Sequence, residues 1–146
     1  MSESALSRPV RRRHCQCQGD GAPARAREEV HRLVDEAGAG GRPVPAEVRD
    51  AALLVASELV TNAVKYASGP CGFDVGWSTD GLDIDVTDSS PTPPRGRPAD
   101  PSGAAGGYGW PLVRRLSSQV DVRPTPEGGK TVHARIPGRP GMPGPG

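Results

Sequence analysis

Glycine and proline gather in two stretches of this chain, and these stretches restrict where regular secondary structure can form. Residues 89–109 hold five prolines and five glycines, and residues 137–146 contain almost nothing else. Proline lacks the backbone N–H that helices and sheets require, and glycine has no side chain to pack. We therefore expect helices and strands before residue 89 and again between the two stretches. The segment 138–146 is expected to be a disordered tail.

The charge balance and the apolar residues exclude several classes of protein. The chain has 146 residues, the size of one domain, and its 18 basic and 17 acidic residues leave a formal net charge of +1. Disordered chains usually carry a large net charge, and nucleic-acid-binding domains carry a basic excess. No apolar run is near the roughly 18 residues of a membrane span, and the polar start lacks a secretory signal. We expect a cytoplasmic protein with no direct contact to nucleic acid or membrane.

Two short motifs near the start of the chain have ordinary explanations. The three cysteines are Cys15, Cys17 and Cys71, and without a signal peptide we interpret them as reduced thiols. His14 beside the first two resembles half of a zinc site, but only Cys71 is left to complete the four ligands. The basic run Arg11–Arg13 could bind DNA, although solvated basic tails of this kind are common.

Two long helices are predicted in the first half of the chain, and a short one later. Apolar residues recur at the spacing of one helix face over residues 26–37, and Gly38 ends that pattern. A second apolar stripe covers about residues 45–67 and opens on a proline, which is favoured in the first turn of a helix. The short helix is expected at 110–118.

Alternating apolar residues predict strands in the rest of the chain. Residues 73–77 and 82–86 alternate between apolar and polar side chains, and the Asp80-Gly81 pair between them is a hairpin signal. Two further strands are expected at 120–122 and 130–136. The order helix, helix, strand, strand, loop, helix, strand, strand is typical of an α+β two-layer sandwich with the helices on one face of the sheet.

Three polar side chains are candidates for chemistry. Glu58 and Asn62 are four residues apart on the second helix, so both project from one face, and their oxygens would suit Mg²⁺. The alternative is the solvated polar face that most helices have. Asp88 follows the strand alternation onto the buried face, where a carboxylate needs a donor such as the amino group of adenine. The alternative there is a turn in which Asp88 accepts a hydrogen bond from Ser90.

A glycine-rich turn precedes the third helix. The segment Gly106-Gly107-Tyr108-Gly109 leads into Trp110, and backbone N–H groups at such a helix start favour an anion. Taken alone, the pattern is also common in flexible joints. It lacks the Gly-Lys-Ser/Thr of a Walker A loop, and it does not join a strand to a helix in a βαβ unit.

The order of these motifs resembles the ATP-binding domain shared by histidine kinases, type II topoisomerases and heat-shock protein 90. Within that superfamily the chain is most similar to the bacterial anti-sigma-factor serine kinases, over about residues 22–137. The resemblance rests on four segments, which are Glu58-Leu-Val-Thr-Asn62-Ala-Val, Asp88-Ser-Ser-Pro91, Gly106-Gly-Tyr-Gly109-Trp-Pro-Leu-Val113 and Gly129-Lys130-Thr131-Val132.

The resemblance implies a fold and a division of the chain. It implies a mixed sheet of four to five strands layered on three helices, with a first strand around residues 10–18. The polar segment 1–21 would supply this strand at the edge of the sheet. Residues 22–137 would form the ATP-binding, kinase-like domain.

The resemblance also implies a role for each motif residue. Glu58 would be the base toward an attacking serine hydroxyl, Asn62 would coordinate Mg²⁺ on the triphosphate, and Asp88 would bind the adenine amino group. Further nucleotide contacts and the lid over ATP would come from Gly107, Gly109, Thr131 and the segment 89–107.

The implied function is transfer of the γ-phosphate of ATP to a serine of an anti-sigma-factor antagonist. The protein would bind a sigma factor or that antagonist, and family analogy suggests a homodimer. The alternative is a non-catalytic partner switch, which binds ATP and sequesters these regulators without turnover. A third interpretation, a detached histidine-kinase fragment, is disfavoured because no phospho-acceptor helix is expected before residue 22.

Overall fold

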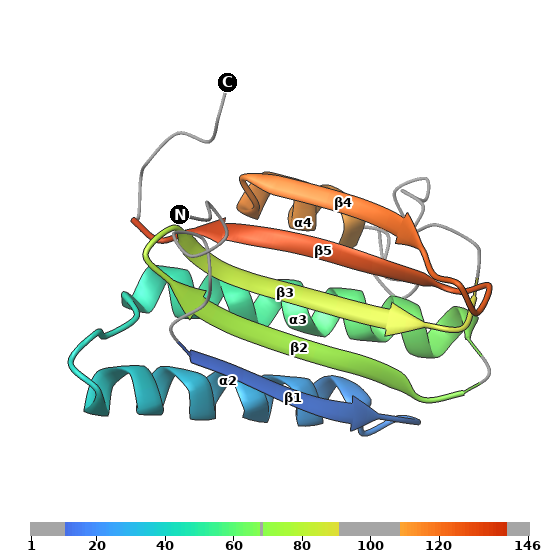
Figure 1. Ribbon diagram of the computed structural model, residues 1–146, viewed down its shortest axis with the longest axis horizontal. Coiled ribbons are helices and arrows are strands. Elements are labelled where there is room, and N and C mark those ends of the chain that lie inside the picture. The colour runs from blue at the N-terminus through green and yellow to red at the C-terminus, as the bar shows by residue number, and fades with distance from the viewer. Residues whose placement is uncertain (1–10, 68, 91–108, 140–146) are drawn as a thin grey trace, which may run out of the picture.

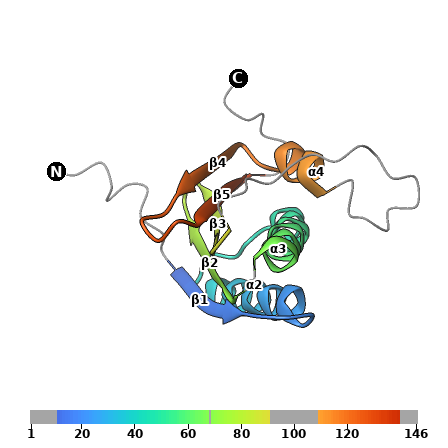
Figure 2. The same cartoon turned by 90° about the vertical axis from the view of Figure 1, so that its right-hand side faces the viewer.

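The computed structural model describes residues 11–67, 69–90 and 109–139. In this part of the chain three helices lie on one face of a five-stranded sheet, which gives two layers (Figure 1, Figure 2). The predicted α+β sandwich is thereby confirmed. The elements in chain order are β1 (Arg11–Cys17), α2 (Ala22–Ala39), α3 (Ala46–Tyr66), β2 (Cys71–Ser78), β3 (Gly81–Asp88), α4 (Gly109–Leu116), β4 (Gln119–Pro124) and β5 (Lys130–Pro137).

The sheet has the strand order β1-β2-β3-β5-β4, and each neighbouring pair is antiparallel. This corrects the expectation of a mixed sheet. β4 runs in the same direction as β3, but β5 lies between them and pairs with both. A pair of helices separates β1 from β2, instead of the single crossover helix that joins neighbouring parallel strands.

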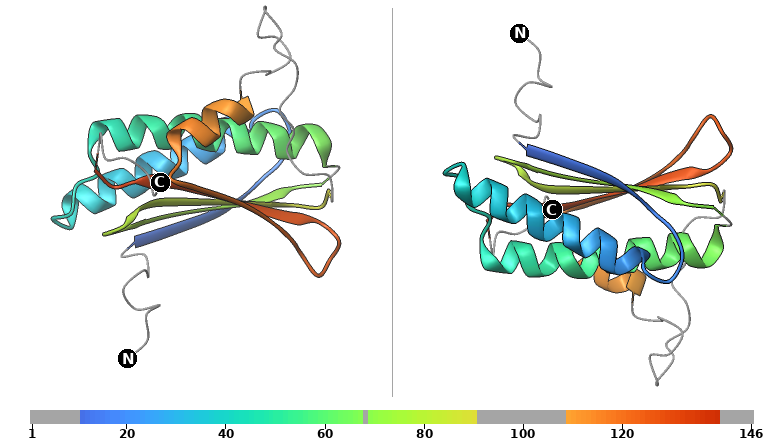
Figure 3. Two further views of the ribbon diagram at one scale, coloured as in Figure 1. Left: turned by 90° about the horizontal axis from the view of Figure 1, so that it is seen from above. Right: turned by 90° about the horizontal axis from the view of Figure 1, so that it is seen from below.

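The core lies between the helices and one face of the sheet. The apolar residues of β2 and β3 point toward the helices, as the alternation over 73–77 and 82–86 predicts. Figure 3 shows the helices along one face of the sheet. Within this layer α2 lies over the β1 edge and α3 over the middle strands (Figure 2). Among the helices that the structure describes, none has the length and apolar character needed to cross a membrane.

Strand β1 is polar, yet it belongs to the sheet because α2 supplies acidic partners. Arg13 points toward the helix layer, and its Nε donates to Oε1 of Glu29 at 2.5 Å. The same guanidinium reaches Oε2 of Glu36. The Glu29 side chain is only 3% exposed, and a buried carboxylate is stable only with a partner of this kind. The edge strand therefore lies close to where the resemblance placed it.

The three cysteines lie together where β1 ends and β2 begins, facing the helices. All three are free and buried, the Sγ atoms of Cys15 and Cys17 are 3.4 Å apart, and Cys17 is directly opposite Cys71 in the sheet. Burial raises the pKa of the Cys17 thiol to about 12. The three side chains are buried members of the hydrophobic core, so we interpret them as core packing. In the three described ranges no group of three or more His, Cys, Asp or Glu residues could hold a metal ion.

The other face of the sheet carries polar side chains, and no described helix covers it (Figure 2). Nε of Arg135 donates to Oδ1 of Asp83 at 2.8 Å. Nδ1 of His133 lies 2.9 Å from Oδ1 of Asp85, and this hydrogen bond raises the pKa of His133 above its usual 6.5. Asp83 faces away from the helices, as predicted, but its neighbours leave it only 8% exposed.

Candidate functional site

Glu58 and Asn62 lie one turn apart on α3, the helix that packs against both the sheet and α4. Both side chains are partly buried. Burial raises the pKa of Glu58 above its usual 4.5, which makes its carboxylate a better proton acceptor. The oxygens of the two side chains are hard donors of the kind that Mg²⁺ prefers. The chemistry of the pair therefore fits a metal-bound phosphate next to a proton acceptor.

Asp88 is the last residue of β3 and is buried on the face that the helices cover. Its Oδ1 accepts the backbone N–H of Ser90 at 2.8 Å. The turn that sequence reasoning offered as the alternative to a binding role is thus present. A carboxylate has room for further donors, so the turn does not by itself prevent Asp88 from binding a ligand.

Lys130 is the partner of Asp88 that sequence reasoning missed. It opens β5 directly opposite Asp88, and its Nζ lies 3.0 Å from Oδ1 and 2.9 Å from Oδ2. The ammonium also donates to the backbone oxygen of Ser90 at 3.2 Å. Two signals could have indicated this pair. Lys130 is in phase with the buried residues Val132 and Ala134, and a buried lysine needs an acid.

Thr131 lies on the opposite face of the sheet from Asp88. Its hydroxyl is 2.7 Å from that of Thr87, the residue directly across from it on β3. The structure therefore brings Asp88 together with Lys130 and Ser90, and leaves Thr131 with Thr87. Strand alternation, which places Thr131 out of phase with the apolar residues of β5, accounts for this.

The glycines expected around the triphosphate are described only in part. Gly109 is the first residue of α4, at the helix end where backbone N–H groups favour anions. Gly107 and most of the predicted lid lie outside the described residues. A further glycine matters to the site. A Cβ at Gly129 would lie 2.0 Å from the backbone oxygen of Asp88, so only glycine allows the end of β3 to pack this closely.

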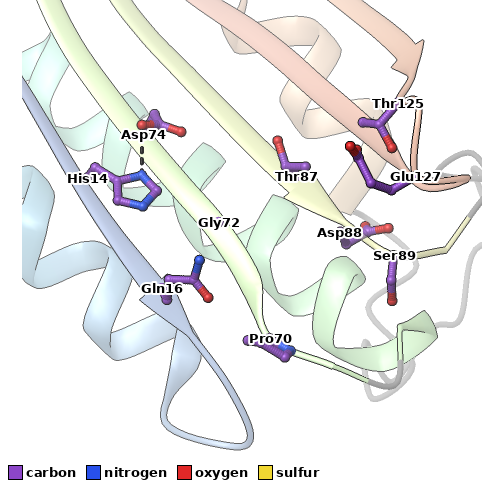
Figure 4. A pocket seen from close by; sticks show the side chains of 10 residues that line it. All are labelled: His14, Gln16, Pro70, Gly72, Asp74, Thr87, Asp88, Ser89, Thr125 and Glu127. Atoms are coloured by element: carbon purple, nitrogen blue, oxygen red, sulfur yellow. Dashed lines mark hydrogen bonds and ion pairs between the residues drawn. The ribbon is translucent and has the colours of Figure 1, made fainter.

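A hollow of about 370 Å³ reaches Asp88 from the face of the sheet that the helices leave open. Figure 4 shows it at the ends of β1, β2 and β3, where Nδ1 of His14 lies 2.8 Å from Oδ1 of Asp74. Most of its lining residues are of polar types, and Glu58 and Asn62 are not among them. The lining residues are His14, Gln16, Pro70, Gly72, Asp74, Thr87, Asp88, Ser89, Thr125 and Glu127.

The sequence model of the histidine kinase-like ATPase domain matches residues 20–136. This span includes Glu58, Asn62, Asp88, Gly109 and Thr131. No curated protein matches the chain.

Proposed function

Because the chain belongs to the histidine kinase-like ATPase domain family, we propose that it is an ATP-binding regulator that phosphorylates a serine of an anti-sigma-factor antagonist. The observation that carries the catalytic part is the position of Glu58. This carboxylate is partly buried, burial raises its pKa, and it lies one helical turn from Asn62. A proton acceptor next to a metal ligand suits the transfer of a phosphoryl group to a serine hydroxyl.

The proposed step is an in-line transfer in which Glu58 accepts the proton of the serine hydroxyl. The serine oxygen forms a bond to the γ-phosphorus, the bond between that phosphorus and the bridging oxygen breaks, and ADP leaves. The Asn62 side-chain oxygen would hold Mg²⁺. When bound, this ion would neutralise charge on the triphosphate. The rest of the catalysis is positioning of the reacting groups.

The nucleotide contacts that we propose come from the ends of two other elements. Asp88 would accept a hydrogen bond from the adenine amino group. Gly109, at the start of α4, would face the phosphates, and Gly107 is proposed for the same role from outside the described residues. We leave Thr131 out of the nucleotide site, since it faces away from Asp88.

The protein partners follow from the resemblance. We propose that a sigma factor or its anti-sigma-factor antagonist binds this protein in the cytoplasm, and that the protein forms a homodimer. Size-exclusion chromatography with light scattering measures the dimer, and a pull-down from lysate with and without Mg-ATP measures the partners. If neither a sigma factor nor an antagonist is recovered with or without Mg-ATP, this part of the proposal is wrong.

The proposed activity is tested by incubating the protein with Mg²⁺, γ-labelled ATP and candidate antagonist proteins. We expect label on a serine with the natural sequence and none with Glu58→Gln, while calorimetry finds ATP still bound to the variant. The matched control is Glu47→Gln, which makes the same change in the exposed first turn of the same helix. If the natural protein binds ATP but labels no serine, the kinase proposal is wrong and the non-catalytic partner switch becomes the better interpretation.

A further inference from the structure

The carboxylate that should bind adenine already holds a cation. Nζ of Lys130 lies within 3.0 Å of both carboxylate oxygens of Asp88 and 3.2 Å from the backbone oxygen of Ser90. An ammonium group has three hydrogens, and here each has an acceptor. The side chains of Lys130 and Asp88 are 6% and 3% exposed. The pair is therefore a buried part of the site, unlike a solvated surface ion pair.

Few acceptor positions remain on Asp88. A carboxylate offers about four lone-pair positions, two on each oxygen. Oδ1 accepts from Lys130 and from the backbone N–H of Ser90, and Oδ2 accepts from Lys130. Among the described residues, these contacts leave one position on Oδ2. An adenine amino group could use that single position or take the place of the ammonium.

Charge favours the ammonium over the amino group. Both donors would bind the same ionised carboxylate, but only the ammonium adds the attraction of a full positive charge, which is strong at a buried position. With Lys130 in place, Asp88 is also neutralised and offers less to a neutral donor. An adenine amino group that displaces Lys130 must therefore compensate for moving a buried cation away from its partner.

We propose that Lys130 is an internal competitor for the adenine position, and that it lowers both the affinity for ATP and the dependence of binding on the 6-amino group. This inference rests on the proposed use of Asp88 for adenine. An ammonium that leaves Asp88 also gives up its hydrogen bond to the backbone oxygen of Ser90. Lys130 is thus a specificity-determining residue that sequence reasoning missed.

The test measures how much the 6-amino group contributes to nucleotide affinity when the ammonium of Lys130 is present and when it is absent. Dissociation constants for ATP and for purine riboside triphosphate, which lacks the 6-amino group, are compared in the natural protein and in Lys130→Met. We expect the natural protein to prefer ATP by only a few-fold. Lys130→Met should raise this preference about tenfold or more, the usual contribution of a hydrogen bond to a charged group. Lys130→Arg is the matched control, because it keeps a cation opposite Asp88 and should keep the small preference.

The ratio of the two dissociation constants separates competition from a general structural effect. A loosened fold weakens both nucleotides together and leaves the ratio unchanged. If Lys130→Met does not fold, Lys130→Gln removes the charge while keeping a polar group, and the same increase in the ratio is expected.

Each outcome decides between the proposals. The competitor proposal is wrong if the ratio of the two dissociation constants is unchanged in a folded neutral variant, or if it rises equally in Lys130→Arg. Neither result affects the proposal that the natural protein binds ATP. ATP binding that is detected only after Lys130 is replaced supports the competitor. No binding of either nucleotide by any of the proteins overturns both the competitor and the proposed ATP site.

Discussion

The hydroxyl oxygens of Thr87 and Thr131 lie 2.7 Å apart on the face of the sheet that the described helices leave open. The contact joins the two strands that carry Asp88 and Lys130. The two threonines stabilise the sheet on the face opposite to the one where Asp88 would bind adenine. Its role is therefore separable from nucleotide binding.

We expect Thr131→Val to lower the free energy of unfolding by about 1 kcal/mol, the usual contribution of one hydrogen bond. The dissociation constant for ATP should stay within about twofold, because the hydroxyl faces away from Asp88. Urea unfolding and calorimetry measure the two quantities. Thr87→Val is the matched control and should behave alike. A large loss of ATP affinity in Thr131→Val alone would restore the nucleotide role first expected for it.

Removing one member of the buried Asp88–Lys130 pair should cost far more than removing both. Asp88→Asn leaves the ammonium of Lys130 buried without its carboxylate, and we expect a loss of about 3–5 kcal/mol in the free energy of unfolding. Adding Lys130→Met should recover much of that loss. Urea unfolding of both single variants and the double variant gives the coupling. If the losses in the free energy of unfolding of the two single variants add up to that of the double variant, the two charges do not stabilise each other.

The raised pKa of Glu58 gives the proposed transfer a definite pH dependence. Only the ionised carboxylate can accept a proton, so the rate should fall as the pH drops through a pKa above the usual 4.5. Initial rates at saturating ATP from about pH 4 to pH 8, a range that includes the usual carboxyl pKa, measure this. ATP affinity is followed over the same range to separate binding from chemistry. A rate that is independent of pH in this range would exclude Glu58 as the base.

Gly129→Ala should disturb the end of β3. The new methyl group would lie 2.0 Å from the backbone oxygen of Asp88, and no side-chain rotation relieves that contact. We expect a cost of about 1–3 kcal/mol, in the range of overpacking, together with weaker ATP binding because Asp88 must move. Gly72→Ala is the control, since its nearest neighbour would be an ordinary 3.7 Å away. Equal unfolding curves for the two variants would contradict the close packing.

Protonation of His133 should stabilise the fold. Its pKa is raised chiefly by the hydrogen bond to Asp85, so its contribution is complete below the usual value of 6.5 and is lost as the pH rises through the raised value. The natural protein should therefore lose on the order of 1 kcal/mol relative to His133→Asn as the pH increases across this window. Urea unfolding at several pH values measures the difference.

The control for His133 is His14→Asn, which breaks an exposed pair with Asp74. Exposed pairs contribute little, so this variant should follow the natural protein at each pH. Parallel curves for the natural protein and His133→Asn would mean that protonation of His133 adds nothing to stability.

Local patterns were sufficient to predict most of the fold. The helices and the hairpin strands were found within a few residues, because their apolar periods and turn residues are local signals. The antiparallel direction of β5 was not predicted, because no local pattern indicates that β5 lies between β3 and β4 in the sheet. Strand β1 came only from the resemblance. Its burial depends on Glu29, a partner 16 residues from Arg13 that no strand pattern includes.

The candidate site was predictable to a smaller extent for the same reason. Alternation correctly put Asp88 on the buried face of the sheet. The contact between Asp88 and Lys130 spans 42 residues and depends on the register of two strands. Register follows from the whole sheet, so the competing cation was visible only in the structure.

The sheet order has a consequence for how the protein assembles. β2 with β3, and β4 with β5, are two hairpins of neighbouring strands, and such hairpins form within microseconds. Asp88 belongs to one hairpin and Lys130 to the other, so closing the long loop between them carries the larger entropy cost. We expect the two hairpins to form early and to dock late. A chain arrested before docking would have most of its strands, but Asp88 and Lys130 would not yet be in contact.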